Sequence, residues 1–461
     1  MTPNQSSLSE RDTASLLHGY TNARQHLTIG PLVIERGDGI YVVDSDGRRY
    51  IEALAGLWSV ALGFSEERLV GAAVRQMRDL PFYHTFSHKS HRPLIELAEK
   101  LISIAPVPMS KVFFTSSGSE AIDSVLKFIW YRSNALGEPK RKKVISRDRA
   151  YHGVTIAAGS LTGLPNNHRS FDLPINGILR AGCPHWWRNA KASESEEEFS
   201  KRLAQELDAL IQAEGPETIA AFFGEPVMGA GGVVVPPAGY WSEIQKVLRK
   251  YDILFVADEV ICGFGRTGQM FGSNTYDLQP DVMVMSKQIS SSYLPISAVM
   301  INERVFEPLA DESNRIGVLG HGFTSGGHPV AAAVAVENIK IIEERNLVEH
   351  AARMGEHMQA SLRDLTDHEL VGEVRGVGLI AAVELVSDKT SKLPLGTVGQ
   401  LGTAACDALL KEGVISRNMG DALAICPPLI ITEPQIDDLT RRLKMALDRT
   451  RDSVPRRSQL L

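Results

Sequence analysis

Lys287 follows a predicted buried strand, a position at which a lysine can take part in catalysis. Residues 282–285 form a continuous apolar run, and Lys287 follows the run after one serine. Such a run is typical of a strand buried on both faces of a parallel sheet, and open α/β sheets bind ligands beyond the carboxyl ends of their strands. We therefore predict a catalytic role for Lys287, although a lysine that snorkels from a strand end to the surface would give the same pattern.

Two further segments combine a strand end with polar groups. Asp258 closes the apolar run 253–257, and a carboxylate buried there needs a cationic partner such as a protonated heterocyclic nitrogen. Ser117, Gly118 and Ser119 lie where the strand 111–115 turns into a helix. Amides and hydroxyls at a helix N-terminus bind anions, so these residues predict a phosphate site. An ordinary serine cap is the alternative.

An aromatic pair and a second acid follow two other predicted strands. Tyr151 and His152 precede Gly153, and Glu225 closes the run 220–224. We expect Tyr151 to stack on a flat ring, while His152 and Glu225 either contact the ligand or support the residues that do. A lysine, an acid for a ring nitrogen, an aromatic ring and a phosphate cup together predict pyridoxal phosphate, which forms an imine with lysine.

The elements that must position these residues alternate between strands and helices from about residue 110. Strands are predicted at 111–115, 143–146, 220–223, 253–257, 282–285 and 296–301. This order indicates an α/β fold with a mostly parallel central sheet. We expect an N-terminal arm that joins the small domain over 1–65, a large cofactor-binding domain over 66–328, and a connector helix with the C-terminal small domain over 329–461.

Composition excludes several classes of protein. With 461 residues, 43% of them hydrophobic, the chain can bury a large core. A net charge of −6 argues against a nucleic-acid partner. The first twelve residues are polar and no apolar run approaches spanning length, so we predict a cytoplasmic protein without a membrane partner. The four scattered cysteines indicate neither a disulfide framework nor a metal site.

The assembled motifs resemble the class III aminotransferases among the fold-type I pyridoxal-phosphate enzymes, over nearly the whole chain. The resemblance is strongest to the (S)-selective ω-transaminase, or amine:pyruvate, branch. It rests on the segments 117–121, 151–153, 225–227, 258–260, 263–268, 322–324 and 327–329, together with Lys287. The chain departs from the family at Ser116 and Ile122, where asparagine is usual, and in the residues after Lys287.

The resemblance implies roles for individual residues. Lys287 would form the imine and carry the proton, Asp258 would pair with the pyridinium nitrogen, and Val260 would pack under the ring. Thr324 would help to hold the phosphate from a neighbouring subunit, which implies a homodimer and leaves open whether dimers pair into tetramers. The implied substrate pocket comprises Tyr20, Leu57, Trp58, Tyr151, Ala230 and Arg417, although a tryptophan such as Trp58 is also a common core residue.

The resemblance also implies the reaction and its rivals. A primary amine or ω-amino acid would give its amino group to pyruvate, with Arg417 binding the keto acid's carboxylate. A 2-oxoglutarate-dependent enzyme of the ornithine or 4-aminobutyrate type is the alternative within the family. Outside the family, the segment Gly263–Gly268 matches the GxGxxG motif of dinucleotide dehydrogenases. That motif requires a helix directly after the glycines, and the sequence shows no helix pattern there.

Overall fold

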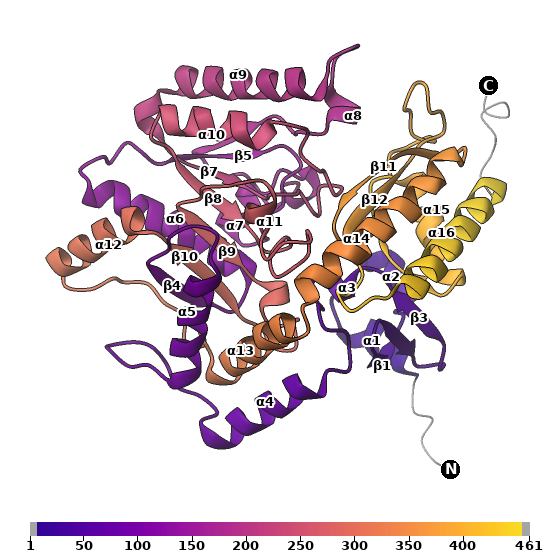
Figure 1. The fold of residues 1–461 in the computed structure, drawn as a ribbon, viewed down its shortest axis with the longest axis horizontal. Coiled ribbons are helices and arrows are strands. Elements are labelled where there is room, and N and C mark those ends of the chain that lie inside the picture. Colours follow the sequence, from indigo (N-terminus) through magenta and orange to yellow (C-terminus); the bar gives the residue numbers. More distant parts are fainter. Residues whose placement is uncertain (1–6, 454–461) are drawn as a thin grey trace.

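The computed structural model describes residues 7–453, which form a large and a small domain (Figure 1). The large domain contains a sheet in the order β4-β10-β9-β8-β7-β5-β6. Its strands are β4 (Lys111–Thr115), β5 (Lys143–Arg147), β6 (Ile178–Ala181), β7 (Ile219–Gly224), β8 (Leu254–Asp258), β9 (Val282–Met285) and β10 (Ser297–Ile301). All pairs from β6 to β9 are parallel, and β10 is antiparallel to both of its neighbours. The predicted α/β class with a mostly parallel sheet is confirmed.

Helices cover both faces of this sheet, because its strands alternate side chains between two apolar cores. In β8, Phe255 and Ala257 join one core, while Leu254 and Val256 join the other. The helices that contribute most of the first core are α4 (Glu67–Asp79), α5 (Arg92–Ile104), α9 (Glu196–Glu214), α10 (Tyr240–Lys250) and α13 (Pro329–Glu344). Three cover the other face, namely α6 (Gly118–Ala135), α7 (Ile156–Leu161) and α12 (Glu303–Ile316). A sheet buried on both faces explains the continuous apolar runs of the sequence.

The small domain packs α14 (Leu347–Arg363), α15 (Gln400–Lys411) and α16 (Glu433–Ser453) around an antiparallel sheet. That sheet has the order β11-β12-β15-β14 and comprises β11 (Val371–Val377), β12 (Ile380–Leu385), β14 (Arg417–Met419) and β15 (Ala422–Ile425). A third sheet joins β1 (Ile34–Asp38), β2 (Tyr41–Asp44) and β3 (Arg49–Glu52) to β13 (Val414–Ile415). The pairing of β3 with β13 therefore ties the N-terminal residues to the C-terminal part of the chain.

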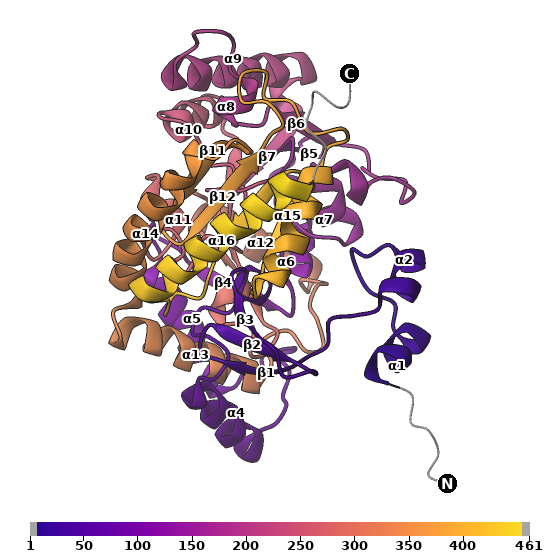
Figure 2. The same cartoon turned by 90° about the vertical axis from the view of Figure 1, so that its right-hand side faces the viewer.

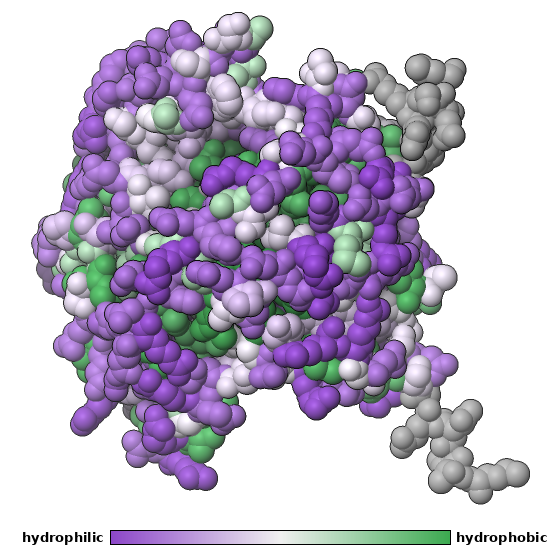
Figure 3. Space-filling view, turned by 45° about the vertical axis from the view of Figure 1, so that its right-hand side comes forward, coloured by the Kyte–Doolittle hydropathy of each residue, from purple (hydrophilic) through white to green (hydrophobic). Residues whose placement is uncertain are grey.

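Two short helices, α1 (Leu8–Ser15) and α2 (Ala23–Ile29), project to one side of the rest of the molecule in Figure 2. Neither helix contains a buried residue. The helices α3 (Ala55–Trp58), α8 (Trp186–Asn189) and α11 (Gly272–Thr275) have only four residues each. The face drawn in Figure 3 is mostly hydrophilic, with hydrophobic patches near its centre. Among residues 7–453, no helix combines the length and the apolar character that a membrane crossing requires.

The glycine-rich segment 263–268 forms a contact between the domains rather than a nucleotide loop. Gly265 lies against Leu429, and Gly268 lies against Ala352 of α14. The buried Arg266 donates from Nη1 to the carbonyls of Leu379 and Pro427 at 2.8 and 2.6 Å. No long helix follows the glycines, since α11 has only four residues. The geometry thus gives no support to the dehydrogenase reading.

Candidate active site

Lys287 lies at the carboxyl edge of the large sheet, directly beyond β9. Its backbone has φ +46°, in the left-handed region that non-glycine residues rarely adopt, as is common at functional sites. Burial lowers the pKa of Lys287, while the charges of Asp258 and Glu225 act in the opposite direction. A lysine with a lowered pKa is more often neutral near pH 7 and can then act as a nucleophile. The cavity beside Lys287 is lined by Gly118, Ser119, Tyr151, His152, Gly153, Glu225, Val227, Asp258, Val260, Ile261, Ser286 and Lys287 itself.

Asp258 ends β8, next to β9, and is only 3% exposed. Its Oδ2 lies 2.7 Å from His152 Nδ1, and its Oδ1 accepts the Val260 amide at 3.1 Å. Since Nδ1 then carries the ring proton, His152 Nε2 is left as an acceptor, and this buried atom has no hydrogen-bond partner among the described residues. The arrangement holds an oriented acid at the cavity wall, as the pairing with a protonated ring nitrogen requires.

The N-terminus of α6 forms another part of the wall. Ser117 Oγ accepts the Glu120 amide at 3.2 Å, so its side chain caps the helix. Gly118 and Ser119 line the cavity, and their amides belong to the first turn, which has no partners within the helix. The predicted anion site is thus available from Gly118 and Ser119, while the hydroxyl of Ser117 already serves as the cap.

A close contact joins this helix end to the loop that carries Tyr151. Ser119 Oγ accepts the Val154 amide at 3.1 Å. A Cβ added to Gly153 would lie 2.5 Å from Ser119 Oγ and 2.9 Å from the Cβ of Ala158, and the φ of Gly153 is +132°. Glycine is therefore required where the two segments meet.

Glu225 holds the loop that carries Tyr151 through hydrogen bonds to the backbone. Its Oε1 accepts the Tyr151 amide at 3.1 Å, and its Oε2 accepts the Gly229 amide at 3.0 Å. Burial raises the pKa of Glu225. Both carboxyl oxygens are engaged with backbone amides, so Glu225 is a positioning residue for Tyr151.

Tyr20 and Arg417 lie close to Tyr151, which lines the cavity. The guanidinium carbon of Arg417 lies 5.5 Å from the centroid of the Tyr20 ring. Tyr20 is 63% exposed, and its hydroxyl accepts a hydrogen bond from Asn167 Nδ2 at 2.5 Å. Burial raises the pKa of Tyr151, and the neighbouring Tyr20 raises it further. Arg417, half-buried on β14, has no acidic partner within residues 7–453 and is available to an anion.

The other predicted pocket residues differ in position. Leu57 is 54% exposed, whereas Trp58 is 2% exposed and packs in a core cluster with Val227 and Ile261. Because Val227 and Ile261 line the cavity, Trp58 backs its wall. Ala230 lies in the turn after Glu225, and Thr324 lies in an exposed loop. Neither Ala230 nor Thr324 lines the cavity of its own chain, so the role of Thr324 in a neighbouring subunit stays a prediction.

Sequence reasoning missed several residues of the site. Val227, Ile261 and Ser286 line the cavity, and Asn167 binds Tyr20. The first three stand next to, or within two residues of, a predicted site residue, so adjacency was the available signal. Asn167 carries no such signal, since only the folded chain brings it to Tyr20.

The whole site can accommodate pyridoxal phosphate. It offers a lysine amine, an oriented buried carboxylate, helix N-terminal amides, and Tyr151 and Val260 as walls for a ring. The buried His152 Nε2 also leaves an acceptor unpaired. Every group that the cofactor requires is present, and each is held by the contacts described above.

Comparisons with known proteins agree on the family. The family model for class-III aminotransferases matches residues 21–447. A solved ω-transaminase from Pseudomonas jessenii in complex with PMP is 63% identical, with a TM-score of 0.96, and the match covers 97% of this chain and 99% of that one. A structure described as a transaminase with L-ala is 67% identical, with a TM-score of 0.91, and covers 92% of this chain and 100% of its own. Gamma aminobutyrate transaminase 1 of Solanum lycopersicum is 48% identical over 95% of this chain and 85% of its own.

Proposed function

This chain belongs to the class III aminotransferases, which are pyridoxal-phosphate enzymes, and we propose that it transfers the amino group of a primary amine or ω-amino acid to pyruvate. The observation that carries the keto-acid assignment is Arg417, a half-buried cation without an acidic partner among the described residues, beside Tyr20 and Tyr151. Similarity to the ω-transaminase with PMP and to the transaminase with L-ala supports the same reaction.

The residues around the cavity would hold the cofactor by the contacts already available to them. Gly118 and Ser119 would bind its phosphate, Asp258 its ring nitrogen, and Tyr151 and Val260 its two faces. Pyridoxal phosphate supplies a carbonyl carbon for amines and a ring that accepts the electrons released at the substrate carbon. Lys287 Nζ would hold the cofactor, and the same amine would be the base that moves the proton of the substrate carbon.

The groups around Tyr151 include a cation and aromatic rings, which could bind two kinds of substrate in turn. Arg417 would bind the carboxylate of pyruvate through a charge-assisted hydrogen bond. The rings of Tyr20 and Tyr151 would contact the apolar substituent of an uncharged amine, with Leu57 at the edge. An arginine that contacts an aromatic ring rather than an acid can change its position without breaking an ion pair. This supports one site that alternates between charged and uncharged substrates.

The similarity to gamma aminobutyrate transaminase 1 supports the alternative function, a class III enzyme for γ-amino acids that uses 2-oxoglutarate. A dicarboxylate would need a second cationic partner besides Arg417. The alternative therefore predicts glutamate as the product, whereas the proposed function predicts alanine.

A homodimer is also part of the proposal. A large hollow outside the active-site cavity is lined by Phe86, Val318, Gly322 and Phe323 among others. Phe86 is 45% and Val318 is 65% exposed, and such apolar patches mark protein interfaces. A second copy of the chain would cover this surface, and Thr324 would then lie near the partner's site. Cytoplasmic localisation stays a prediction from the sequence.

The test of the proposed function is a co-substrate comparison. The holoenzyme is supplied with 1-phenylethylamine and either pyruvate or 2-oxoglutarate, and alanine and glutamate are quantified. The proposed function predicts that alanine forms from pyruvate at least about tenfold faster than glutamate forms from 2-oxoglutarate. A tenfold ratio corresponds to a difference of about 1.4 kcal/mol in transition-state binding. A higher rate with 2-oxoglutarate would favour the alternative.

A further inference from the structure

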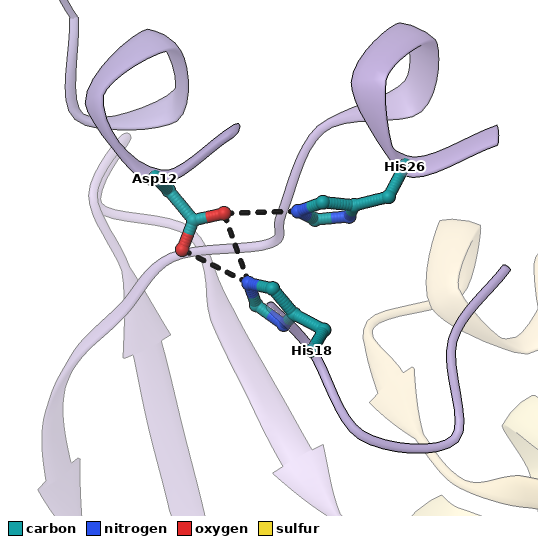
Figure 4. Close-up of side chains that lie close together, drawn as sticks. All are labelled: Asp12, His18 and His26. Atoms are coloured by element: carbon teal, nitrogen blue, oxygen red, sulfur yellow. Dashed lines mark hydrogen bonds and ion pairs between the residues drawn. The ribbon is translucent and has the colours of Figure 1, made fainter. Parts of the chain in front are cut away.

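Three side chains of types that can bind metals meet in the N-terminal arm, and none of them lines the active-site cavity (Figure 4). Asp12 lies on α1, His26 on α2, and His18 on the segment that joins the two helices. Asp12 Oδ1 lies 2.9 Å from His18 Nε2 and 2.9 Å from His26 Nε2, and Oδ2 lies 3.1 Å from His18 Nε2. Both histidines thus direct the same ring nitrogen at one carboxylate.

The carboxylate at the centre of this group is charged and lacks a permanent cation. Within residues 7–453, Asp12 forms ion pairs with the two histidines and with no lysine or arginine. A bound cation would therefore supply the permanent positive charge that this carboxylate lacks.

A second group of similar composition shows what a compensated site looks like. His185 lies with Glu373 and Glu384 at comparable spacing. There, Arg188 binds Glu384 at 2.6 Å, and Arg375 binds Glu373 and Glu384 at 2.6 and 2.7 Å. The guanidinium groups neutralise both acids and leave no reason for a metal, in contrast to Asp12.

Within a single chain, the helices of the arm bury no residue against each other. No residue of α1 or α2 is buried, and Leu17 and Ile29 are 87% and 79% exposed. The three polar side chains are partly buried, with side-chain exposures of 15% for Asp12, 33% for His18 and 10% for His26. Small units without a core are commonly stabilised by a metal or another cross-link.

We propose that Asp12, His18 and His26 form a binding site for Zn²⁺ or a similar divalent transition metal that fastens α1 to α2. Two imidazole nitrogens and one carboxylate oxygen are a common ligand set for such ions. Metal–ligand distances of about 2.0–2.2 Å place ligand atoms about 3.0–3.5 Å apart, so the group needs to open only slightly. Each histidine would bind the metal through Nε2 and carry its ring proton on Nδ1. Water would complete the coordination.

The site would also act on the arm that carries Tyr20. Tyr20 follows His18 by two residues and contacts Arg417. A metal bound to His18 would therefore restrict the movement of Tyr20 beside Arg417. This consequence is separate from the proposed reaction, because metal binding can be measured without any substrate.

The experiment is calorimetric titration of ZnCl₂ into metal-free holoenzyme, with Asp12→Asn, His18→Gln and His26→Gln compared separately. The matched control is His357→Gln, which alters a surface histidine that also pairs with one acid, Asp437, at 2.7 Å but has no second histidine. We expect one zinc ion per chain for the wild type and for the control. Loss of any one ligand should weaken binding by about tenfold or more.

Circular dichroism and the half-reaction with amine would show that each variant is folded. Co²⁺ in place of Zn²⁺ provides a second readout, because its visible absorption bands report the ligand field and should disappear in the His26→Gln variant. Zinc affinity that is equal in the wild type, the three variants and the control would overturn the proposal. So would zinc binding lost equally from the control and the three variants.

Discussion

Replacement of Asp258 by asparagine separates the charge of this residue from its shape. The carboxylate is 3% exposed and accepts hydrogen bonds from His152 Nδ1 and the Val260 amide. Asparagine has the same shape: its Oδ1 can still accept the Val260 amide, and its Nδ2 can donate to His152 Nδ1 if the ring proton of His152 moves to Nε2, so Asp258→Asn should fold normally and keep the local geometry. What it loses is one negative charge at the position that would pair with the ring nitrogen of the cofactor.

The size of this loss follows from the burial of the carboxylate. Two unit charges about 4 Å apart interact by about 4 kcal/mol at an effective dielectric constant of 20, which suits a site screened from water. If that interaction is lost in the transition state, the amine half-reaction should slow by about 10³-fold. In bulk water the same pair would be worth only about 1 kcal/mol, or roughly fivefold in rate.

The assay is stopped-flow absorbance of the holoenzyme after mixing with 1-phenylethylamine, under single-turnover conditions. Asp281→Asn is the matched control. Asp281 accepts the Phe255 amide at 2.9 Å at the opposite edge of the same sheet, where it also meets Arg304. Its substitution should change the rate by less than about threefold, as expected for a residue outside the site. A decrease of less than about tenfold for Asp258→Asn would refute the electrostatic reasoning.

Two further substitutions test other parts of the site, and a third tests the stability of the fold. Arg417→Ala should raise the KM for pyruvate by about 10–100-fold, because a hydrogen bond to a charged group is worth about 1.5–3 kcal/mol. The same variant should leave the half-reaction with the amine nearly unchanged. An equal effect on both half-reactions would contradict the role of Arg417 in binding the carboxylate. Gly153→Ala should weaken cofactor binding, since its Cβ would lie 2.5 Å from Ser119 Oγ, and titration of the apoenzyme with pyridoxal phosphate measures this; unchanged affinity would show that the two segments move apart freely. Burial raises the pKa of Glu52 to about 8, so the folded state binds a proton that the unfolded state releases, and stability falls as pH rises from about 4.5 to 8 with a slope of at most about 1.4 kcal/mol per pH unit. Glu52→Gln should remove this slope in urea unfolding at pH 6, 7 and 8, and parallel profiles for both proteins would refute it.

The sequence predicted the catalytic edge of the sheet well, for a physical reason. Strands buried on both faces must be apolar throughout, so residues 253–257 and 282–285 stood out and located Asp258 and Lys287 at their ends. The same reasoning could not give the direction of β10, because a buried antiparallel strand has the same composition as a parallel one. Nor did it identify β6, which has four residues, with Arg180 among them.

Other features depended on contacts that no local pattern encodes. Ser117 could have been a helix cap or a phosphate ligand, because both roles use an oxygen at a helix N-terminus, and the structure shows the cap. Tyr20 meets Arg417 only because the arm and the small domain lie side by side in the fold. The grouping of His18 and His26 around Asp12 likewise follows no recognised metal-binding spacing.

The most direct test of the account is the absorbance spectrum of the holoenzyme before and after 1-phenylethylamine, and again after pyruvate, with Lys287→Ala as the control. The account predicts a yellow protein that loses its colour with the amine and regains it with pyruvate. The Lys287→Ala variant should do neither at a comparable rate. A protein that binds no pyridoxal phosphate, or a variant that completes both half-reactions as fast as the wild type, would contradict the assignment of Lys287.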